Sequence, residues 1–225
     1  MYSDAITAFR NGNPVLIFDA DTREGETDIV IPSQFITPEF IRIMRRDGGG
    51  LICTTVKQDD AEKLGLPYIE DLFRKCLNMD KSILNADDMK YDKDSTFSIT
   101  INSRDTFTGI SDNDRSLTVR HFADFLENME ENGPDQKGFG SVFRTPGHIH
   151  LLIARNGYFS RRRGHTELST YLVEQAGLVP SATIVEMLGD DGKSMARDKT
   201  EDYARKHGYG FVTGEEIISV WSENR

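Results

Sequence analysis

The run Pro14-Val-Leu-Ile-Phe-Asp-Ala-Asp-Thr-Arg-Glu-Gly-Glu-Thr-Asp-Ile-Val-Ile-Pro-Ser33 joins two short apolar segments through a charged connection. The apolar and β-branched residues at its two ends predict strands at Pro14–Asp19 and Ile29–Ser33. Strands that are apolar throughout are typical of a sheet covered on both faces. Because the connection between them is short, we expect some antiparallel pairing here.

Outside this run, segments of helical and of strand character alternate along the chain. Further strands are predicted at Leu51–Val56, Thr96–Asn102, Ile149–Ala154 and Ala182–Leu188. Helices are predicted at Asp4–Asn11, Pro38–Asp47, Asp114–Leu126, Thr166–Ala176, Asp198–His207 and Gly214–Ser222. This order predicts the α/β (α+β) class: a mixed β-sheet covered by helices in a three-layer α/β/α sandwich. The polar stretch Glu127–Gly140 is interpreted as a surface loop within a single domain spanning residues 1–225.

Composition excludes several classes of function. The 225 residues include 27 Lys and Arg against 37 Asp and Glu, a net charge of −10, which disfavours a general role on nucleic acid or an anionic membrane. The apolar runs fall far short of the roughly 20 residues that a membrane-spanning helix needs. The first residues lack the pattern of a signal peptide, and two cysteines make no disulfide framework. We therefore expect a protein of the reducing cytoplasm.

The charged connection Asp19–Asp28 holds five carboxylates and one arginine. One interpretation is a solvated charged turn. The other is that closely spaced carboxylates at strand ends bind a hard divalent cation, with Arg23 available for an anionic substrate. Composition alone leaves both open.

A second unusual segment, Arg161–Glu167, has the sequence RRRGHTE and precedes a predicted helix. Helix N-termini bind phosphate through free backbone N–H groups, and here Arg162, Gly164 and Thr166 add charge, close approach and a hydroxyl. The alternative is a basic loop with a capping threonine; an RNA-binding patch is disfavoured by the net charge. His165 is either a metal ligand or a surface imidazole.

Four further positions carry possible chemistry. Glu186 lies in an otherwise apolar strand, where a buried carboxylate would be a candidate general acid or base. His148 follows a Pro-Gly turn and could transfer protons or merely hold the loop. Cys53 is more typical of a small buried hydrophobe than of a nucleophile. The Thr106–Asp114 turn can cap the next helix or contact an anion.

Six motifs occur in one order, and the order is far more specific than any single motif. They are DADTREGETDIV, GGGLICT, SITINSRDTFTGISDNDRS, TPGHIHLL, RRRGHTE and VEMLGDDGKSMARD. Together they closely resemble the 3,4-dihydroxy-2-butanone 4-phosphate synthase family of riboflavin biosynthesis, in its archaeal, monofunctional form. The resemblance runs from about Ala5 to Ile218 and is weakest at Asp71–Lys90 and Glu127–Gly140.

This resemblance implies a lyase that converts D-ribulose 5-phosphate to L-3,4-dihydroxy-2-butanone 4-phosphate and formate. It implies Mg²⁺ (or Mn²⁺), two ions per active site, no organic cofactor, and a homodimer with active sites at the interface. The implied reaction passes through an enediol that the metal stabilises, followed by rearrangement of the carbon skeleton and loss of C4. The alternatives are another metal-dependent sugar-phosphate isomerase or aldolase, which would release no formate, and an RNA-binding module without turnover.

The resemblance also implies roles for individual residues. The metal ligands are Glu24 and His165. The catalytic group contains His148, Glu186, Asp21, Glu26 and Cys53, of which Cys53 is expected to pack or position rather than attack. The substrate-binding group contains Arg23, Glu24, Asp28, Thr108, Arg162, Arg163, Gly164, His165, Thr166 and Glu186. Which acid or base serves which proton transfer stays open, and the acidic connection is expected to close over substrate.

The chain departs from the family pattern at two places. Arg163 stands where family members often carry a neutral residue, which gives three consecutive arginines. This third arginine would change phosphate affinity or face solvent. Gly25 and Thr27 match the archaeal form of the acidic motif rather than the bacterial form, so the flexibility of that connection can differ between the two.

Overall fold

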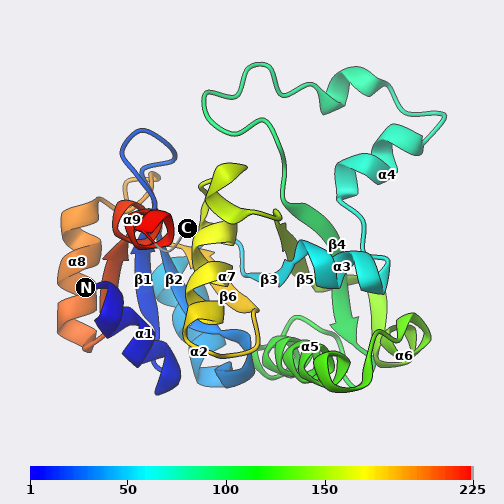
Figure 1. Cartoon of the computed structure of the whole chain (residues 1–225), viewed down its shortest axis with the longest axis horizontal. Helices are drawn as coiled ribbons and strands as arrows, with labels where there is room; N and C mark the ends of the chain where they lie inside the picture. Colours follow the sequence, from blue (N-terminus) through cyan, green and yellow to red (C-terminus); the bar gives the residue numbers. More distant parts are fainter. Residues whose placement is uncertain (224–225) are drawn as a thin grey trace.

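The computed structural model describes residues 1–223 and has one seven-stranded mixed sheet at its centre (Figure 1). The strand order is β4-β5-β3-β6-β2-β1-β7. The strands are β1 (Val15–Phe18), β2 (Thr27–Pro32), β3 (Cys53–Lys57), β4 (Phe97–Ser103), β5 (Phe143–Ala154), β6 (Ala182–Glu186) and β7 (Gly210–Thr213). The predicted mixed sheet is confirmed.

The pairing of β1 with β2 is antiparallel, as expected from their short connection. β2 also pairs antiparallel with β6, so that Asp28 faces Glu186 across the two strands. β3 runs parallel to β5, with Cys53 beside His150, and antiparallel to β6. These registers bring the start of β2, the start of β3 and the end of β6 to the same end of the sheet.

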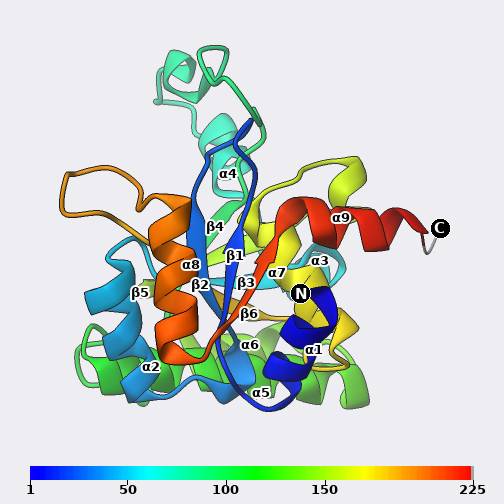
Figure 2. The same ribbon diagram turned by 90° about the vertical axis from the view of Figure 1, so that its left-hand side faces the viewer.

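Helices cover both faces of the sheet, which confirms the three-layer arrangement. They are α1 (Tyr2–Arg10), α2 (Pro38–Ile43), α3 (Gln58–Leu64), α4 (Ile69–Lys75), α5 (Asp112–Asn132), α6 (Gln136–Val142), α7 (His165–Gln175), α8 (Arg197–His207) and α9 (Gly214–Glu223). Helices α1, α7 and α9 contribute to the hydrophobic core on one face, and α2, α5 and α8 to the core on the other. Figure 2 shows α1 and α8 on opposite sides of β1 and β2.

Side-chain alternation in the strands explains why both faces are apolar. In β1, Val15 and Ile17 belong to the α7-side core, whereas Leu16 belongs to the α5-side core. In β2, Val30 lies on the α7 side and Ile29 on the α5 side. A strand buried on both faces reads as an unbroken apolar run because successive side chains point to opposite layers.

The interpretation of Glu127–Gly140 as a surface loop is wrong. Helix α5 continues through Asn132, and α6 begins at Gln136, so only residues 133–135 connect two helices. Met129 and Phe139 supply the apolar contacts that hold these turns against the core. In this stretch, a few buried apolar residues are enough to favour helix over loop, although most residues are polar or glycine.

The segment between α3 and β4 extends beyond the rest of the molecule and carries α4 (Figure 1). Helix α4 contains no buried residue, and Leu77 is 96% exposed. Near its return to the sheet, however, this segment reaches back to Arg23 through Tyr91 and Asp92. Within residues 1–223, no helix combines the length and the apolar character needed to cross a membrane.

Candidate functional site

The acidic connection between β1 and β2 is folded around Asp19. The buried carboxylate of Asp19 accepts the backbone N–H groups of Glu24 and Glu26, both at 3.0 Å. It also accepts a hydrogen bond of 3.1 Å from Nη1 of Arg23. Gly25 adopts a φ of +67°, which a residue with a Cβ adopts at a cost. The connection is therefore an ordered structure and not a solvated turn.

His165 is the first residue of α7 and is buried against this connection. Its Nδ1 lies 3.5 Å from Oε2 of Glu24, and its Nε2 lies 3.7 Å from Oδ1 of Asp28. Ligand atoms of Asp19, Glu24 and His165 all lie within 4.8 Å of one another. The two predicted metal ligands, Glu24 and His165, are thus brought together, and Asp19 joins them.

The protonation of this cluster is shifted by burial and by mutual charge. Burial raises the pKa of Asp28 to about 8; His165 opposes this rise and Glu186 adds to it. Burial lowers the pKa of His165, but the charges of Asp28 and Glu24 outweigh it and raise the value to about 9. Burial raises the pKa of Glu24, but hydrogen bonding to His165 and the charge of Arg23 outweigh burial and lower the value to about 2.

This donor set fits a hard divalent cation. Oδ1 of Asp28 is buried and has no hydrogen-bond donor among the described residues. Carboxylate oxygens and a neutral imidazole are suitable ligands for Mg²⁺ or Mn²⁺, and a cation would replace the proton that now relieves the repulsion between the carboxylates. Asp19, Glu24, Asp28 and His165 are the residues that could hold it.

Polar side chains continue from Asp28 across the end of the sheet. Asp28 pairs with Glu186, whose Oε2 accepts the backbone N–H of Leu51 at 2.7 Å. Cys53 pairs with His150, and extending this parallel register by two residues beyond the start of β3 would bring Leu51 beside His148. Side chains of paired residues share a face of the sheet, and here that is the face covered by α7. Asp28, Glu186 and His148 therefore belong to one row.

His148 stands three strands from Asp28 in this row, a separation of roughly 14 Å at about 4.8 Å per strand. The N–H of His148 donates to Oδ1 of Asn102 at 2.8 Å, and its ring Nδ1 lies 3.1 Å from Nδ2 of the same residue. This asparagine holds an otherwise exposed imidazole. Within one chain, His148 therefore lies on the face covered by α7, as Asp28 does, but away from the carboxylate cluster.

Gly50 allows Glu186 to sit at the end of β6. A Cβ on Gly50 would lie 2.2 Å from Oε2 and 3.0 Å from the backbone N of Glu186. Cys53 is buried on the same face, and burial together with the charges of Glu186 and Asp28 raises the pKa of its thiol. A protonated, buried thiol agrees with the expectation that Cys53 packs rather than attacks.

The N-terminus of α7 forms the basic end of the site. Gly164 is the N-cap residue, and Thr166 is buried with its hydroxyl 3.2 Å from that of Thr96. Arg162 donates from Nη1 to the buried carboxylate of Glu167 at 2.8 Å. Arg163 and the other two arginines of the triplet line a cavity of about 410 Å³ beside Asp19 and Arg23. The residues of the predicted phosphate cradle thus lie next to the carboxylate cluster, and their binding of phosphate stays a prediction.

Three predicted residues lie at the margin. Glu26 hydrogen-bonds the hydroxyl of Ser194 from the segment after β6. Asp21 is exposed at the tip of the acidic connection. Thr108 is exposed in the turn after β4, where its N–H donates to the carboxylate of Asp114 at 3.1 Å. The turn is capped as predicted, by Ser111, which accepts the N–H of Asp114.

Sequence reasoning missed three residues of this site. Asp19 and Glu167 lie inside the two motifs singled out from the sequence. Their place in these motifs could have indicated a role in the site, although no role was assigned to their side chains. Asp92 contacts both Arg23 and Arg162 from the projecting segment. No local pattern marks Asp92, because only the fold brings it to the two arginines.

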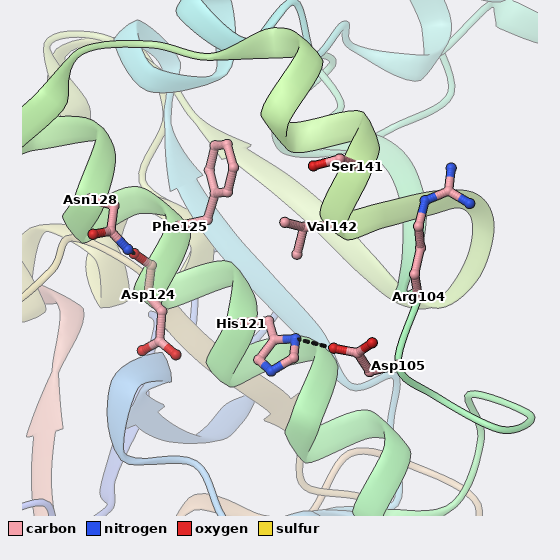
Figure 3. A pocket seen from close by; sticks show the side chains of 8 residues that line it. All are labelled: Arg104, Asp105, His121, Asp124, Phe125, Asn128, Ser141 and Val142. Carbon is pink, nitrogen blue, oxygen red and sulfur yellow. Dashed lines mark hydrogen bonds and ion pairs between the residues drawn. The ribbon is translucent and has the colours of Figure 1, made fainter.

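A separate cavity of about 330 Å³ lies between α5 and α6 (Figure 3). His121 lines it, with its Nδ1 2.9 Å from the hydroxyl of the buried Ser103 and 3.9 Å from a carboxylate oxygen of Asp105. Phe125 and Val142 complete its apolar side. This cavity borders the α5-side core, whereas the carboxylate cluster lies on the α7 side, so the two are distinct.

Comparisons with known proteins agree on one family. The family model for 3,4-dihydroxy-2-butanone 4-phosphate synthase matches residues 3–220. The enzyme of that name from Methanothermobacter thermautotrophicus is 44% identical over all of this chain and 97% of its own length. The one from Archaeoglobus fulgidus is 42% identical over all of this chain and 95% of its own.

Solved structures agree with this result. A 3,4-dihydroxy-2-butanone 4-phosphate synthase structure in complex with two magnesium ions has a TM-score of 0.76 and 27% identity to this chain, over 98% of this chain and 96% of that one. The enzyme from Candida albicans has a TM-score of 0.75 and 28% identity, over 97% of this chain and 95% of that one.

Proposed function

Because the chain belongs to the 3,4-dihydroxy-2-butanone 4-phosphate synthase family, we propose that it converts D-ribulose 5-phosphate to L-3,4-dihydroxy-2-butanone 4-phosphate and formate, a step of riboflavin biosynthesis. The observation that carries the proposal is the junction of two sites. A carboxylate–imidazole cluster suited to a divalent cation adjoins an arginine-rich helix N-terminus suited to phosphate. A phosphorylated sugar carries both the hydroxyls and the phosphate that such a junction binds.

The metal end is assigned to Glu24 and His165, with Asp19 and Asp28 beside them. Mg²⁺ or Mn²⁺ bound there, two ions per site, supplies positive charge that stabilises negative charge developing on the sugar oxygens. Arg23 holds Glu24 and Asp19 in place through its guanidinium. No organic cofactor is needed for this chemistry.

The phosphate end is assigned to Arg162, Gly164 and Thr166. The N-terminus of α7 offers free backbone N–H groups and the positive end of the helix dipole. The side chain of Arg162 is held by an ion pair with Glu167, so little conformational entropy is lost at Arg162 when substrate binds. Arg163 lines the same cavity and adds charge there.

Proton transfer is assigned to Glu186, His148, Asp21 and Glu26. The reaction removes the C3 proton, expels the C1 hydroxyl, moves C5 with its phosphate from C4 to C3 and releases C4 as formate, and protons must be delivered or removed along the way. Glu186 lies beside Asp28 and is placed to act at the sugar carbons. Cys53 is buried on the same face of the sheet as Glu186 and is assigned a packing role.

We also propose that the active enzyme is a homodimer with active sites at the interface. His148 and Thr108 are far from the carboxylate cluster within one chain, and ribulose 5-phosphate is too short to span the roughly 14 Å row. Phe107, next to Thr108, is 95% exposed in the single chain. A second copy packed over this turn would bury Phe107 and complete the site. Two unpaired cysteines are consistent with the reducing cytoplasm as the location.

Metal-dependent formate release tests the function and separates it from an isomerase or aldolase. We expect formate from ribulose 5-phosphate with Mg²⁺ and none with a chelator. Glu24→Gln or His165→Ala should abolish turnover through loss of metal binding while the far-ultraviolet circular dichroism stays unchanged. Glu39→Gln, a change on α2, is the matched control and should retain turnover. Full turnover in either ligand variant would refute the metal assignment.

A further inference from the structure

Two arginines from different motifs converge on one glycine at the start of α7. A Cβ on Gly164 would lie 2.2 Å from Nη1 of Arg162 and 2.6 Å from Nη2 of Arg23. Gly164 is the N-cap of α7, so both guanidinium groups lie at the N-terminus of an eleven-residue helix. Two cationic groups and a helix N-terminus at one point form a binding position for an anion.

The carboxylate of Asp92 occupies the space between these arginines. Its Oδ2 lies 2.9 Å from Nε and 2.8 Å from Nη2 of Arg23, and 3.4 Å from Nε of Arg162. The ring of Tyr91 lies 5.2 Å from the guanidinium carbon of Arg23. Two consecutive residues of the projecting segment therefore contact Arg23, and one of them, Asp92, also contacts Arg162, which is assigned above to the substrate phosphate.

Asp92 accepts only some of the hydrogen bonds that the two arginines can donate. A single oxygen, Oδ2, makes all of these contacts, whereas a bidentate pair would use both carboxylate oxygens. Nη2 of Arg23 and Nε of Arg162 are buried and have no hydrogen-bond acceptor of good geometry among the described residues. The side chain of Arg23 is only 7% exposed. Buried donors without acceptors are costly, and a phosphate, with three acceptor oxygens, would relieve both.

Asp92 also lines two cavities. One, of about 410 Å³, is lined by Asp19 and Arg163. The other, of about 310 Å³, is lined by Glu24 and Thr96. Asp92 and Arg162 line both cavities. Asp92 therefore borders both of the spaces beside these arginines that a ligand could enter.

We propose that Asp92 is a specificity-determining residue that stands in for the substrate phosphate in the unliganded enzyme. The inference rests on the proposed function, which assigns Arg162 to the phosphate, and it adds Arg23 as a second phosphate contact. An incoming anion must displace a carboxylate already paired with both arginines. A phosphate dianion, with more charge and more acceptor oxygens than a carboxylate, does this effectively, whereas a monoanion or an unphosphorylated sugar does not.

Replacing the carboxylate without changing its shape tests the proposal. Asp92→Asn should lower both KM for ribulose 5-phosphate and the inhibition constant of inorganic phosphate by about fivefold, because the binding-competent state no longer competes with an internal anion. Turnover at saturation should stay within about twofold. Acetate, which barely inhibits the parent, should become a measurable competitor. Asp92→Ala should move all three quantities in the same direction.

The control is Asp88→Asn, which removes the same charge from an exposed position of the same segment and touches neither cavity. It should leave KM and phosphate inhibition unchanged. A higher KM in Asp92→Asn would make Asp92 a positioning residue for the arginines and would overturn the proposal, as would an unchanged KM. If the parent enzyme releases no formate, the proposed function fails instead. Calorimetric titration of the parent and Asp92→Asn with inorganic phosphate would still decide the role of Asp92.

Discussion

At the scale of single residues, the site depends on a row of ionisable side chains on one face of the sheet. Asp28 and Glu186 pair across β2 and β6, and His148 lies on β5 two residues before His150, which pairs with Cys53. Strand alternation places all three side chains on the α7 side. Groups fixed in this way are suited to proton transfer, because their positions do not have to be ordered during the reaction.

We predict that Glu186→Gln and His148→Ala bind substrate yet turn it over poorly. Both residues are assigned to proton transfer, so kcat should fall by about 100-fold or more while KM changes little. Steady-state formate release gives both constants. His121→Ala, on the opposite face, is the control and should keep kcat. A higher KM with unchanged kcat in either variant would contradict the assignment.

The protonation of the cluster predicts how the metal-free protein responds to pH. The pKa of His165 is raised from 6.5 to about 9, so the folded state binds this proton more tightly than the unfolded chain. Its contribution to stability is fully present below pH 6.5 and is lost as the pH rises through about 9. The raised pKa of Asp28 acts in the same direction.

The melting temperature measured with a chelator should therefore fall between pH 6.5 and 9. Saturating Mg²⁺ should flatten this dependence, because the metal replaces the proton. A metal-free melting temperature that stays level or rises over this range would contradict the account of the cluster.

The site residues predictable from sequence were those inside dense motifs. Glu24, His165 and Arg162 come together as expected because each motif lies at the end of a strand or the start of a helix. Asp92 was not predictable, because its role arises from a contact between segments 69 residues apart in the sequence. The position of His148 across three strands likewise follows from the register of the sheet and not from the TPGH motif itself.

At the scale of elements, α7 connects the two ends of the site. His165 at its first position faces the carboxylates, and Glu167, fully buried two residues later, holds Arg162. The other carboxylate oxygen of Glu167 accepts the backbone N–H of Arg155 at 3.1 Å, just after β5. One buried carboxylate thus ties the phosphate end to the sheet.

We predict that Glu167→Ala destabilises the fold and weakens substrate binding together. Breaking a buried ion pair costs about 3 kcal/mol of unfolding free energy, and a released Arg162 should raise KM. Urea denaturation and steady-state kinetics measure the two effects. Glu130→Ala, on an exposed part of α5, is the control. Unchanged stability and KM in the Glu167 variant would show that Arg162 is held by other contacts.

The elements were predicted where the apolar period was clear and missed where it was short. The six predicted strands and six predicted helices all exist, with shifted ends. Strand β7 has four residues and begins with glycine, so its apolar content is too small to stand out. Helix α4 has seven residues, and although Ile69, Leu72 and Phe73 follow helical spacing, a stripe of two turns is too short to stand out in the sequence.

At the scale of the whole molecule, we predict that the chain functions as a dimer. Phe107→Ser should convert a dimer into a monomer and remove most activity, because the exposed ring lies next to Thr108 in a turn that the second copy is proposed to cover. Light scattering gives the mass, to be compared with the 25.4 kDa chain. Leu77→Ser, equally exposed on the projecting segment, is the control. A fully active monomer would refute the dimeric site.

The central claim is that the metal end and the phosphate end together excise one carbon from a sugar phosphate. The most direct measurement incubates the protein with ribulose 5-phosphate labelled with carbon-13 at C4 and follows the label by NMR, with Mg²⁺ or with a chelator. The account predicts labelled formate only when the metal is present. A label that stays in a five-carbon sugar phosphate, with the metal present, would contradict it and identify an isomerase.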